Sequence, residues 1–270
     1  MGWTYLGIFL IVSLVLSAVG FYKYVYFLSI GYGLSVAGIG VTMAIMSLVG
    51  AFENVGVVHY VLYALLVVYG IRLSGFLLIR ELKNASYKKT DVFKATLKND
   101  EKKPMPFFVK FVIWVCVAVL YVAQTSPVFF RVYNGGKTSA LAWIGAVICV
   151  FAIILESAAD KQKSKQKAEN PNMVATKGLY KIVRCPNYLG EILFWTGLTV
   201  SSLDILSGWG QWLTAIIAYI CIVYIMFNGA QRLEKRQMKR YGDNPEYNAY
   251  ADKTPILIPL LPIYHLNKKK

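Results

Sequence analysis

The sequence is poor in acidic residues and in residues that bind metals. Its 270 residues include 14 Asp and Glu against 29 Lys and Arg, for a formal net charge of +15. The four cysteines and two histidines show no C-x-x-C or Cys/His spacing of the kind that zinc sites use. We therefore expect no structural metal and no disulfide, and we assign His59 and His265 to membrane interfaces.

Apolar residues dominate what is present. They make up 57% of the chain, aromatic residues make up 14%, and the mean hydropathy of +0.49 is far above that of a soluble domain. Segments of about 20 apolar residues cross the ~30 Å hydrocarbon core as helices. We therefore predict an all-α integral membrane protein with seven transmembrane helices. The predicted spans are Trp3–Gly20, Tyr26–Val49, Val57–Ile79, Phe107–Phe130, Thr138–Leu155, Ile192–Leu206 and Trp209–Phe227.

Charge is distributed unevenly between the segments that join these spans. The segments Arg80–Pro106, Glu156–Gly190 and Asn228–Lys270, with Lys23, hold 25 of the 29 basic residues and fall on one side of a seven-span protein. Lysine and arginine accumulate on the cytoplasmic side, so we expect the N-terminus outside and the C-terminus inside. The first span lacks a charged n-region and a cleavage site, so we expect it to be retained. Positive charge in such loops fits membrane lipids or a specific anionic ligand, and it does not indicate nucleic-acid binding.

The segment VRCPNYLGEILFW, Val183–Trp195, carries polar groups into an apolar helix. Pro186 favours a helix start, where backbone N–H groups and a positive dipole attract anions. Asn187 and Glu191 are one turn apart on one face, and Gly190 beside them permits close backbone approach. One interpretation is that Asn187 caps the helix and Glu191 pairs with a nearby lysine. The other is a ligand-binding pair at membrane depth.

The segment LESAADKQKSKQK, residues 155–167, continues a predicted span into a charged helix. Glu156, Asp160, Lys163 and Lys167 recur on one helical face at intervals of three or four residues. This pattern is typical of a solvated helix beside the membrane. It also suits a ligand whose hydroxyl or amide is held by Asp160 and whose phosphates contact Lys163 and Lys167.

Two further segments combine cations with tyrosines. In VYGIRLSGFLLIR, Arg72 lies inside the third span with Tyr69 one turn away, and it either snorkels to the interface or binds an anionic group. In QRLEKRQMKRYGDNPEYNAYADKTPILIP, Arg232 and Arg236 recur at helical spacing and Tyr247 follows. The second pattern fits an amphipathic helix on an anionic leaflet and also a clamp for adenosine phosphates.

The glycine run GYGLSVAGIG, Gly31–Gly40, lies within the second predicted span. A dinucleotide-binding turn needs a preceding strand and a βαβ unit, which an apolar span does not supply. We therefore predict that these glycines allow close packing of helices.

Three of these segments together resemble the C-terminal half of the membrane steroid 5-alpha-reductase-like proteins, including bacterial proteins of the DUF1295 type. The family pattern runs E-x-x-x-D-x-Q, then R-H-P-N-Y-x-G-E…W, then L-E-x-R…R-Y…Y-x-x-Y…I-P. The chain matches it with Glu156-Ser-Ala-Ala-Asp160-Lys-Gln162, then Arg184-Cys185-Pro186-Asn187-Tyr188-Leu189-Gly190-Glu191…Trp195, then Leu233-Glu234-Lys-Arg236…Arg240-Tyr241…Tyr247-x-x-Tyr250…Ile258-Pro259.

The resemblance implies a reductase of a bacterial inner membrane that uses NADPH and takes a lipophilic enone from the bilayer. It implies one transmembrane domain over residues 1–270, with residues 1–106 on the substrate side and residues 107–270 around a cofactor cavity open to the cytoplasm. Tyr69 and Glu191 would be catalytic, Tyr69 as the donor to the substrate carbonyl and Glu191 as a group that orients the nicotinamide. The implied cofactor-binding residues are Arg72, Asp160, Lys163, Lys167, Arg184, Asn187, Tyr188, Glu191, Arg232, Arg236 and Tyr247.

The chain departs from the family pattern at positions that matter for chemistry. Cys185 stands where the usual motif has histidine. The steroid enzymes pair their tyrosine with a glutamate of the second span, which has no acid here, although Ser29 and Tyr32 lie in that region. Two other classes stay open. One is an S-adenosylmethionine-dependent methyltransferase of the isoprenylcysteine carboxyl type, which shares parts of these motifs, and the other is a non-enzymatic lipid-binding protein.

Overall fold

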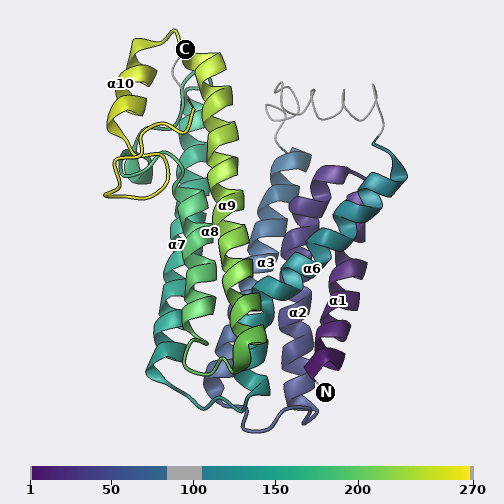
Figure 1. Cartoon of the computed structure of the whole chain (residues 1–270). Helices are drawn as coiled ribbons and strands as arrows, with labels where there is room; N and C mark the ends of the chain where they lie inside the picture. Colours follow the sequence, from purple (N-terminus) through teal and green to yellow (C-terminus); the bar gives the residue numbers. More distant parts are fainter. Residues whose placement is uncertain (1, 84–104, 268–270) are drawn as a thin grey trace. The chain divides into compact units, whose positions relative to one another are not determined.

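The computed structural model describes residues 2–83 and 105–267, and every regular element in that part of the chain is a helix (Figure 1). The elements are α1 (Gly2–Ser17), η1 (Ala18–Phe21), η2 (Tyr24–Leu28), α2 (Ile30–Leu48), α3 (Val57–Lys83), α6 (Phe107–Tyr133), α7 (Ala140–Glu169), η3 (Gly178–Lys181), α8 (Pro186–Val200), α9 (Gly208–Tyr241) and α10 (Pro245–Lys253). Six of the described helices are long and apolar enough to cross a membrane. The chain is therefore an all-α membrane protein. The predicted connector at Arg80–Pro106 lies mostly outside the described residues.

Six of the seven predicted spans correspond to these long helices. The remaining one, the sixth in chain order, corresponds to α8, which is shorter than a span. The prediction placed it at Ile192–Leu206, whereas α8 begins at Pro186 and ends at Val200. Proline occupies the first turn, where its missing N–H costs no hydrogen bond, as its position in the sequence predicts. The 15 residues of α8 extend about 22 Å at 1.5 Å per residue, so a seventh span is not confirmed.

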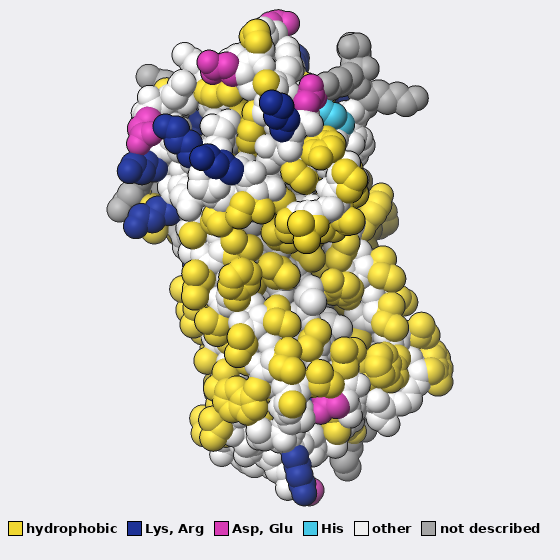
Figure 2. All heavy atoms as spheres, turned by 90° about the vertical axis from the view of Figure 1, so that its left-hand side faces the viewer, with side chains coloured by type: hydrophobic (Ala, Val, Ile, Leu, Met, Phe, Trp, Pro, Cys, Tyr) yellow, Lys and Arg dark blue, Asp and Glu magenta, His cyan; other side chains and the backbone are white. Residues whose placement is uncertain are grey.

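Helices α7 and α9 continue beyond the predicted spans and carry the charged segments with them. The predicted spans end at Leu155 and Phe227, but the helices run on to Glu169 and Tyr241. Figure 2 shows the consequence on one face, where hydrophobic side chains cover the length of the helices and charged side chains gather at the end that carries α10. The charged segments are therefore helical extensions beyond the apolar region.

The chain divides into two compact units. Unit 1 comprises residues 1–142 and 202–215, and unit 2 comprises residues 143–201 and 216–270. In unit 1, α2 and α3 pack closely through glycines. A Cβ atom on Gly33 would lie 2.5 Å from the carbonyl oxygen of Gly70, and one on Gly70 would lie 2.8 Å from the backbone nitrogen of Ala37. The prediction that the glycine run serves helix packing is confirmed.

Unit 1 also contains a proline inside α6 whose cost is locally offset. Pro127 has no N–H, so the carbonyl of Ala123 one turn earlier loses its helical donor. The Ser126 hydroxyl donates to that carbonyl at 2.7 Å. The helix therefore continues to Tyr133 with this buried acceptor satisfied.

A buried arginine lies near the end of α6. Arg131 is 0% exposed and donates to Asp204 at 2.7 Å, to the Lys137 carbonyl at 2.7 Å and to the Ser139 hydroxyl at 2.8 Å. Its partner Asp204 lies in the turn between α8 and α9, and the spacing of 73 residues gives no local signal for the pair.

In unit 2, α7 and α8 pack closely along their length. A Cβ atom on Gly197 would lie 2.6 Å from the Cys149 sulfur, and one on Gly190 would lie 2.9 Å from the Cβ atom of Glu156. The predicted role of Gly190 in close backbone approach is therefore confirmed. This packing fixes the first turns of α8 against the point where α7 changes from apolar to charged.

Candidate functional site

The loop that leads from α7 to α8 is held by two glutamines of α7. The Gln162 side chain accepts from the backbone N–H of Leu179 at 2.9 Å. The Gln166 side chain accepts from the N–H groups of Thr176 and Lys177, each at 2.9 Å, and donates to the Lys177 carbonyl at 3.1 Å. The glutamine of the E-x-x-x-D-x-Q motif therefore positions the chain that enters α8.

The start of α8 is fixed from the other side by the segment that follows α10. The N–H of Arg184 donates to the Pro255 carbonyl at 2.9 Å, and the N–H of Cys185 donates to the Ile256 carbonyl at 3.0 Å. Both donors precede Pro186 directly. Two backbone hydrogen bonds thus hold the residues that begin the helix carrying Asn187 and Glu191.

Arg184 forms a buried ion pair that the sequence did not indicate. Its guanidinium donates to Glu234 of α9 at 2.7 Å and also to the Tyr264 carbonyl, and the two charged residues are 4% and 1% exposed. Glu234 accepts in addition from the backbone N–H groups of Leu266 and Asn267, both at 2.9 Å. The motif residues Arg184 and Glu234 therefore bind α8, α9 and the C-terminal segment together.

Asn187, Tyr188 and Glu191 lie in the first turns of α8. Glu191 is buried, with 8% exposure, while Asn187 and Tyr188 are partly buried. The Tyr188 ring packs against Gly229 of α9, where an added Cβ atom would lie 3.3 Å from the ring. The charges of Glu191, Arg232 and Arg236 all act on the Tyr188 hydroxyl. Residues of α8 and α9 that the sequence grouped separately are therefore neighbours.

The acidic and basic residues of α7 border the same place. The Asp160 charge acts on Tyr180, and the Lys163 charge acts on the Cys185 thiol directly before α8. Lys167 lies farther along and donates to the Tyr241 hydroxyl at 2.8 Å and to the carbonyl of Met173. Asp160 and Lys163 therefore belong to the neighbourhood of α8, whereas Lys167 ties the end of α7 to α9.

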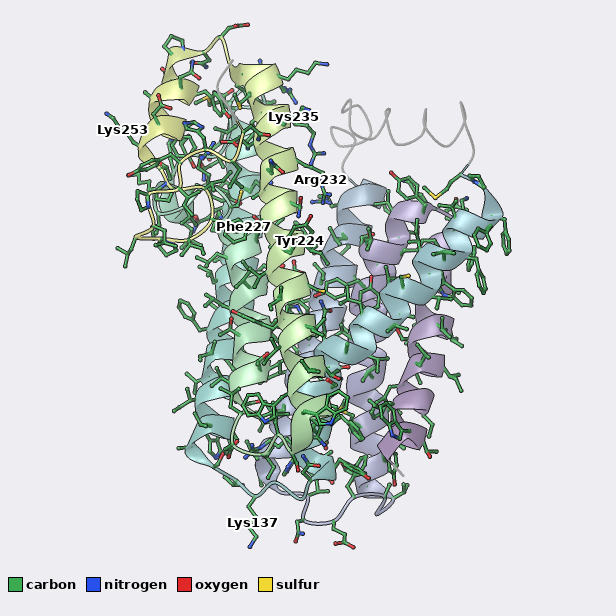
Figure 3. The ribbon with its side chains drawn as sticks, viewed as in Figure 1. Lys137, Tyr224, Phe227, Arg232, Lys235 and Lys253 are labelled. Atoms are coloured by element: carbon green, nitrogen blue, oxygen red, sulfur yellow. The ribbon has the colours of Figure 1, made fainter. Side chains whose placement is uncertain are left out.

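The predicted phosphate clamp on α9 is exposed. Arg232 and Arg236 are both exposed, and the Arg236 side chain donates to the Arg232 carbonyl at 3.3 Å. Figure 3 shows the order along α9, with Tyr224 and Phe227 followed by Arg232 and then Lys235. Their exposed guanidinium groups suit them to contact phosphate oxygens.

Burial makes several groups around α8 poor acids. It raises the pKa of the Cys185 thiol to about 11, and it raises the pKa of Tyr180, Tyr250 and Tyr247 above the usual tyrosine value. Tyr247 is 1% exposed and lies beside the Arg184 guanidinium. A thiol with so high a pKa is not an activated nucleophile. We therefore assign Cys185 and Tyr247 to packing, and a direct contact of Tyr247 with cofactor stays a prediction.

The remaining predicted site residues, Tyr69 and Arg72, belong to α3 in unit 1. Tyr69 is 0% exposed, and its hydroxyl lies 3.4 Å from that of Tyr32 on α2. Ser29, the other residue noted in that region, donates to the Val25 carbonyl at 2.9 Å. Arg72 follows Tyr69 by one turn and is partly buried. The structure thus pairs Tyr69 with a second phenol.

No group of three metal-binding side chains occurs among the residues that the structure describes. The histidine and carboxylate side chains of this region instead form hydrogen bonds with one another and with other groups of the protein. His265, for example, contacts Glu234 at 3.1 Å and Asp252 at 2.8 Å. These side chains therefore belong to the hydrogen-bond network that joins α9, α10 and the C-terminal segment.

Comparison with known families matches residues 33–254 to one family model, described as a protein of unknown function (DUF1295). The chain belongs to the DUF1295 family. This family includes steroid 5-alpha-reductase-like proteins. The matched range begins within α2 and ends just after α10, and so it covers both Tyr69 and the groups around α8. No curated protein and no solved structure matched the chain.

Proposed function

We propose that this DUF1295 protein is an NADPH-dependent reductase of a C=C bond conjugated to a carbonyl in a lipophilic substrate. A 3-oxo-4-ene steroid or a related enone lipid is the substrate class. The observation that supports this most is the packing of the Tyr188 ring against Gly229, which brings the start of α8 beside the part of α9 that leads to Arg232 and Arg236. Carboxylate, amide and guanidinium groups from two helices match the mixed chemistry of a phosphorylated dinucleotide.

The donor set fits the parts of NADPH one by one. Asn187 offers an amide to the nicotinamide carboxamide, and Glu191 and Asp160 offer carboxylates to ribose hydroxyls. Arg232, Arg236 and Lys163 offer cations to phosphates, with Arg able to bind in a bidentate way. Arg184 forms an ion pair with Glu234 that joins α8 to α9, and its contact with the cofactor stays a prediction.

The catalytic contribution of the chain itself comes from Tyr69. NADPH supplies the hydride that the reaction requires. The Tyr69 hydroxyl donates a hydrogen bond to the substrate carbonyl, where negative charge develops. One such preorganised donor in an apolar site stabilises the transition state by roughly 3–4 kcal/mol.

The proposed cofactor also fits the proposed orientation. The charged end of unit 2 carries the extensions of α7 and α9 together with α10 (Figure 2). With the N-terminus outside and the C-terminus in the cytoplasm, basic residues face the compartment that supplies NADPH. We assign the protein to a bacterial inner membrane on the same reasoning.

Purified protein in detergent tests the cofactor assignment by thermal unfolding. We expect NADPH at saturating concentration to raise Tm more than NADH does, and S-adenosylmethionine to leave it unchanged. Replacing Arg232 by alanine weakens the NADPH effect, whereas Lys253→Ala, which removes an equal charge from α10 in the same unit (Figure 3), leaves it intact. A shift with S-adenosylmethionine alone would favour a methyltransferase. No shift with any of the three would favour a lipid-binding protein.

A further inference from the structure

The segment that follows α10 exposes a run of apolar residues. Leu260 is 99% exposed, and Leu261, Pro262 and Ile263 after it are also exposed. Single exposed leucines are common on protein surfaces, but a contiguous apolar patch marks a contact with a partner or with the membrane. Residues 254–267 contain no lysine, arginine, aspartate or glutamate. The exposed run therefore lies within a stretch that carries no fixed charge.

The backbone of residues 256–263 closes on itself, and we call this segment the apolar loop. The N–H of Ile256 donates to the Ile263 carbonyl at 2.9 Å, and the N–H of Ile263 donates to the Leu261 carbonyl at 2.7 Å. The two prolines of the loop have no N–H that needs an acceptor. Unsatisfied backbone groups are the main cost of moving irregular chain out of water. The sequence and the hydrogen bonds of the apolar loop both lower that cost.

The backbone at the tip of the apolar loop is strained. Leu260 has a φ of 68°, in a region that bulky L-residues rarely adopt. Strain of this kind persists where other contacts or a function maintain it. Because Leu260 is 99% exposed, packing against the described part of the chain does not maintain it. A contact outside the chain explains why a leucine is presented here.

The base of the apolar loop lies close to the edge of the apolar part of unit 2. Its Ile256 carbonyl accepts from the N–H of Cys185, directly before α8. Five residues later Gly190 packs against Glu156, where α7 changes from apolar to charged. Five helical residues extend about 7.5 Å, and the headgroup layer on each side of the hydrocarbon is about 5–7.5 Å thick. Figure 1 shows the segment after α10 lying nearer than α10 to the middle of α7 and α8, so the loop lies at the level of the headgroups.

We propose that the apolar loop inserts its tip, residues 260–263, into the headgroup layer of the bilayer and anchors the chain around the start of α8 to the membrane surface. Lipid is the partner because the loop adjoins the lipid-facing surface of its own unit. Ile154 of α7, two residues before the change from apolar to charged, is 61% exposed, and Phe151 is 57% exposed. Apolar side chains at this depth bind the boundary between headgroups and acyl chains. The anchor needs neither cofactor nor substrate, so it is tested apart from the proposed function.

A fluorescent probe tests the insertion in the full chain, held in nanodiscs of phosphatidylcholine and phosphatidylglycerol. The probe, an NBD group, is attached to Leu260→Cys after Cys116 and Cys221, the two cysteines that are not buried, are replaced by alanine. The control position is Lys253→Cys, which is exposed on α10 of the same unit. We expect iodide in the water to quench the tip probe about fivefold less than the control probe. Phospholipids with a nitroxide high in the acyl chain should quench the tip probe more strongly than the control probe.

A charge at the tip tests whether apolar character drives the insertion. Leu260→Asp is combined with the NBD probe at Leu261→Cys in the same nanodiscs. Aspartate tolerates a positive φ better than leucine, so the loop backbone is not disturbed. We expect iodide quenching of the probe to rise about threefold to fivefold, because a carboxylate is costly to place among lipids. Lys253→Asp introduces the same side chain on α10 and should leave the quenching unchanged.

Three results would overturn the anchor. Equal iodide quenching at the tip and at the control position would place the tip in water. A tip probe protected from iodide but not quenched by the nitroxide lipids would mean that protein, such as a second copy of the chain, covers the loop. Unchanged quenching in Leu260→Asp would show that the apolar side chain does not hold the tip in place. None of these results depends on whether the protein binds NADPH.

Discussion

The surroundings of Tyr69 in unit 1 and the surroundings of α8 in unit 2 satisfy their buried polar groups in different ways. Around Tyr69 in unit 1 the partners are neutral, such as the Tyr121 hydroxyl on the Phe27 carbonyl and the Ser74 hydroxyl on the Ile30 carbonyl. Around α8 in unit 2 the partners are charged, above all Arg184 and Glu234. A neutral hydrogen-bonding site costs less to maintain in an apolar region, whereas an anionic ligand from water is better bound by fixed charges. The proposed lipid substrate would need neutral partners of the first kind, and the proposed phosphorylated cofactor would need charged partners of the second kind.

The largest effect should come from breaking the charged core of unit 2. Glu234→Ala leaves the buried Arg184 guanidinium without its carboxylate, which costs about 3–5 kcal/mol of unfolding free energy. The Tm of the protein in detergent should fall accordingly. Asp252→Ala is the control, because the Asp252 side chain is 44% exposed and its pairing with His265 is worth at most about 1 kcal/mol. Equal losses for the two variants would mean that the Arg184–Glu234 pair is not the core of unit 2.

A smaller loss of unfolding free energy should follow from disturbing the packing of α2 against α3 in unit 1. In Gly70→Ala the new Cβ atom would lie 2.8 Å from the backbone nitrogen of Ala37, so α2 and α3 must separate. Such overpacking costs about 1–3 kcal/mol. Gly75→Ala on the same helix meets nothing within 4 Å and should be neutral or slightly stabilising. If both variants unfold at the temperature of the native protein, close glycine packing does not stabilise unit 1.

The sequence predicted the helices well because their signals are local. Hydrophobic runs located six long helices, and Pro186 marked the start of α8. The predicted span began and ended six residues later than α8. The apolar run Ile192–Leu206 continues past the end of the helix, and hydropathy does not report where a chain turns. In α7 and α9 the opposite happens, because each helix continues for several turns after its apolar run has ended.

The site was only partly predictable, because its decisive contacts join distant residues. Motif spacing singled out Asn187, Glu191 and Arg232, and the structure brings their helices together at Tyr188. The resemblance assigned Arg184 to the cofactor, which stays a prediction, and it gave no sign of the ion pair with Glu234, 50 residues away in sequence. Glu234 belonged to a quoted motif, so the signal was present, but a motif does not distinguish a residue that binds ligand from one that holds the site.

The smallest predicted effect concerns the charged pair of unit 1, which lies near a helix end where water has access. Burial alone would raise the pKa of Asp204, but hydrogen bonds from Arg131 and Ser139 and the charge of Arg131 outweigh it, so the pKa is lowered. The native state then binds fewer protons than the unfolded state, whose Asp pKa is about 3.9. The stabilisation is therefore present above that value and is lost as pH falls through the lower, folded pKa.

Thermal unfolding of the native protein and of Asp204→Asn across acidic pH measures this contribution. The difference in Tm between them should be constant at neutral pH and should shrink below about pH 4, as the native carboxylate becomes protonated. The effect should be smaller than that of Glu234→Ala, because the Asp204 side chain is 30% exposed whereas that of Glu234 is fully buried. A difference that grows on acidification would mean that the pKa of Asp204 is raised in the folded protein, and that Arg131 does not hold Asp204 as a carboxylate.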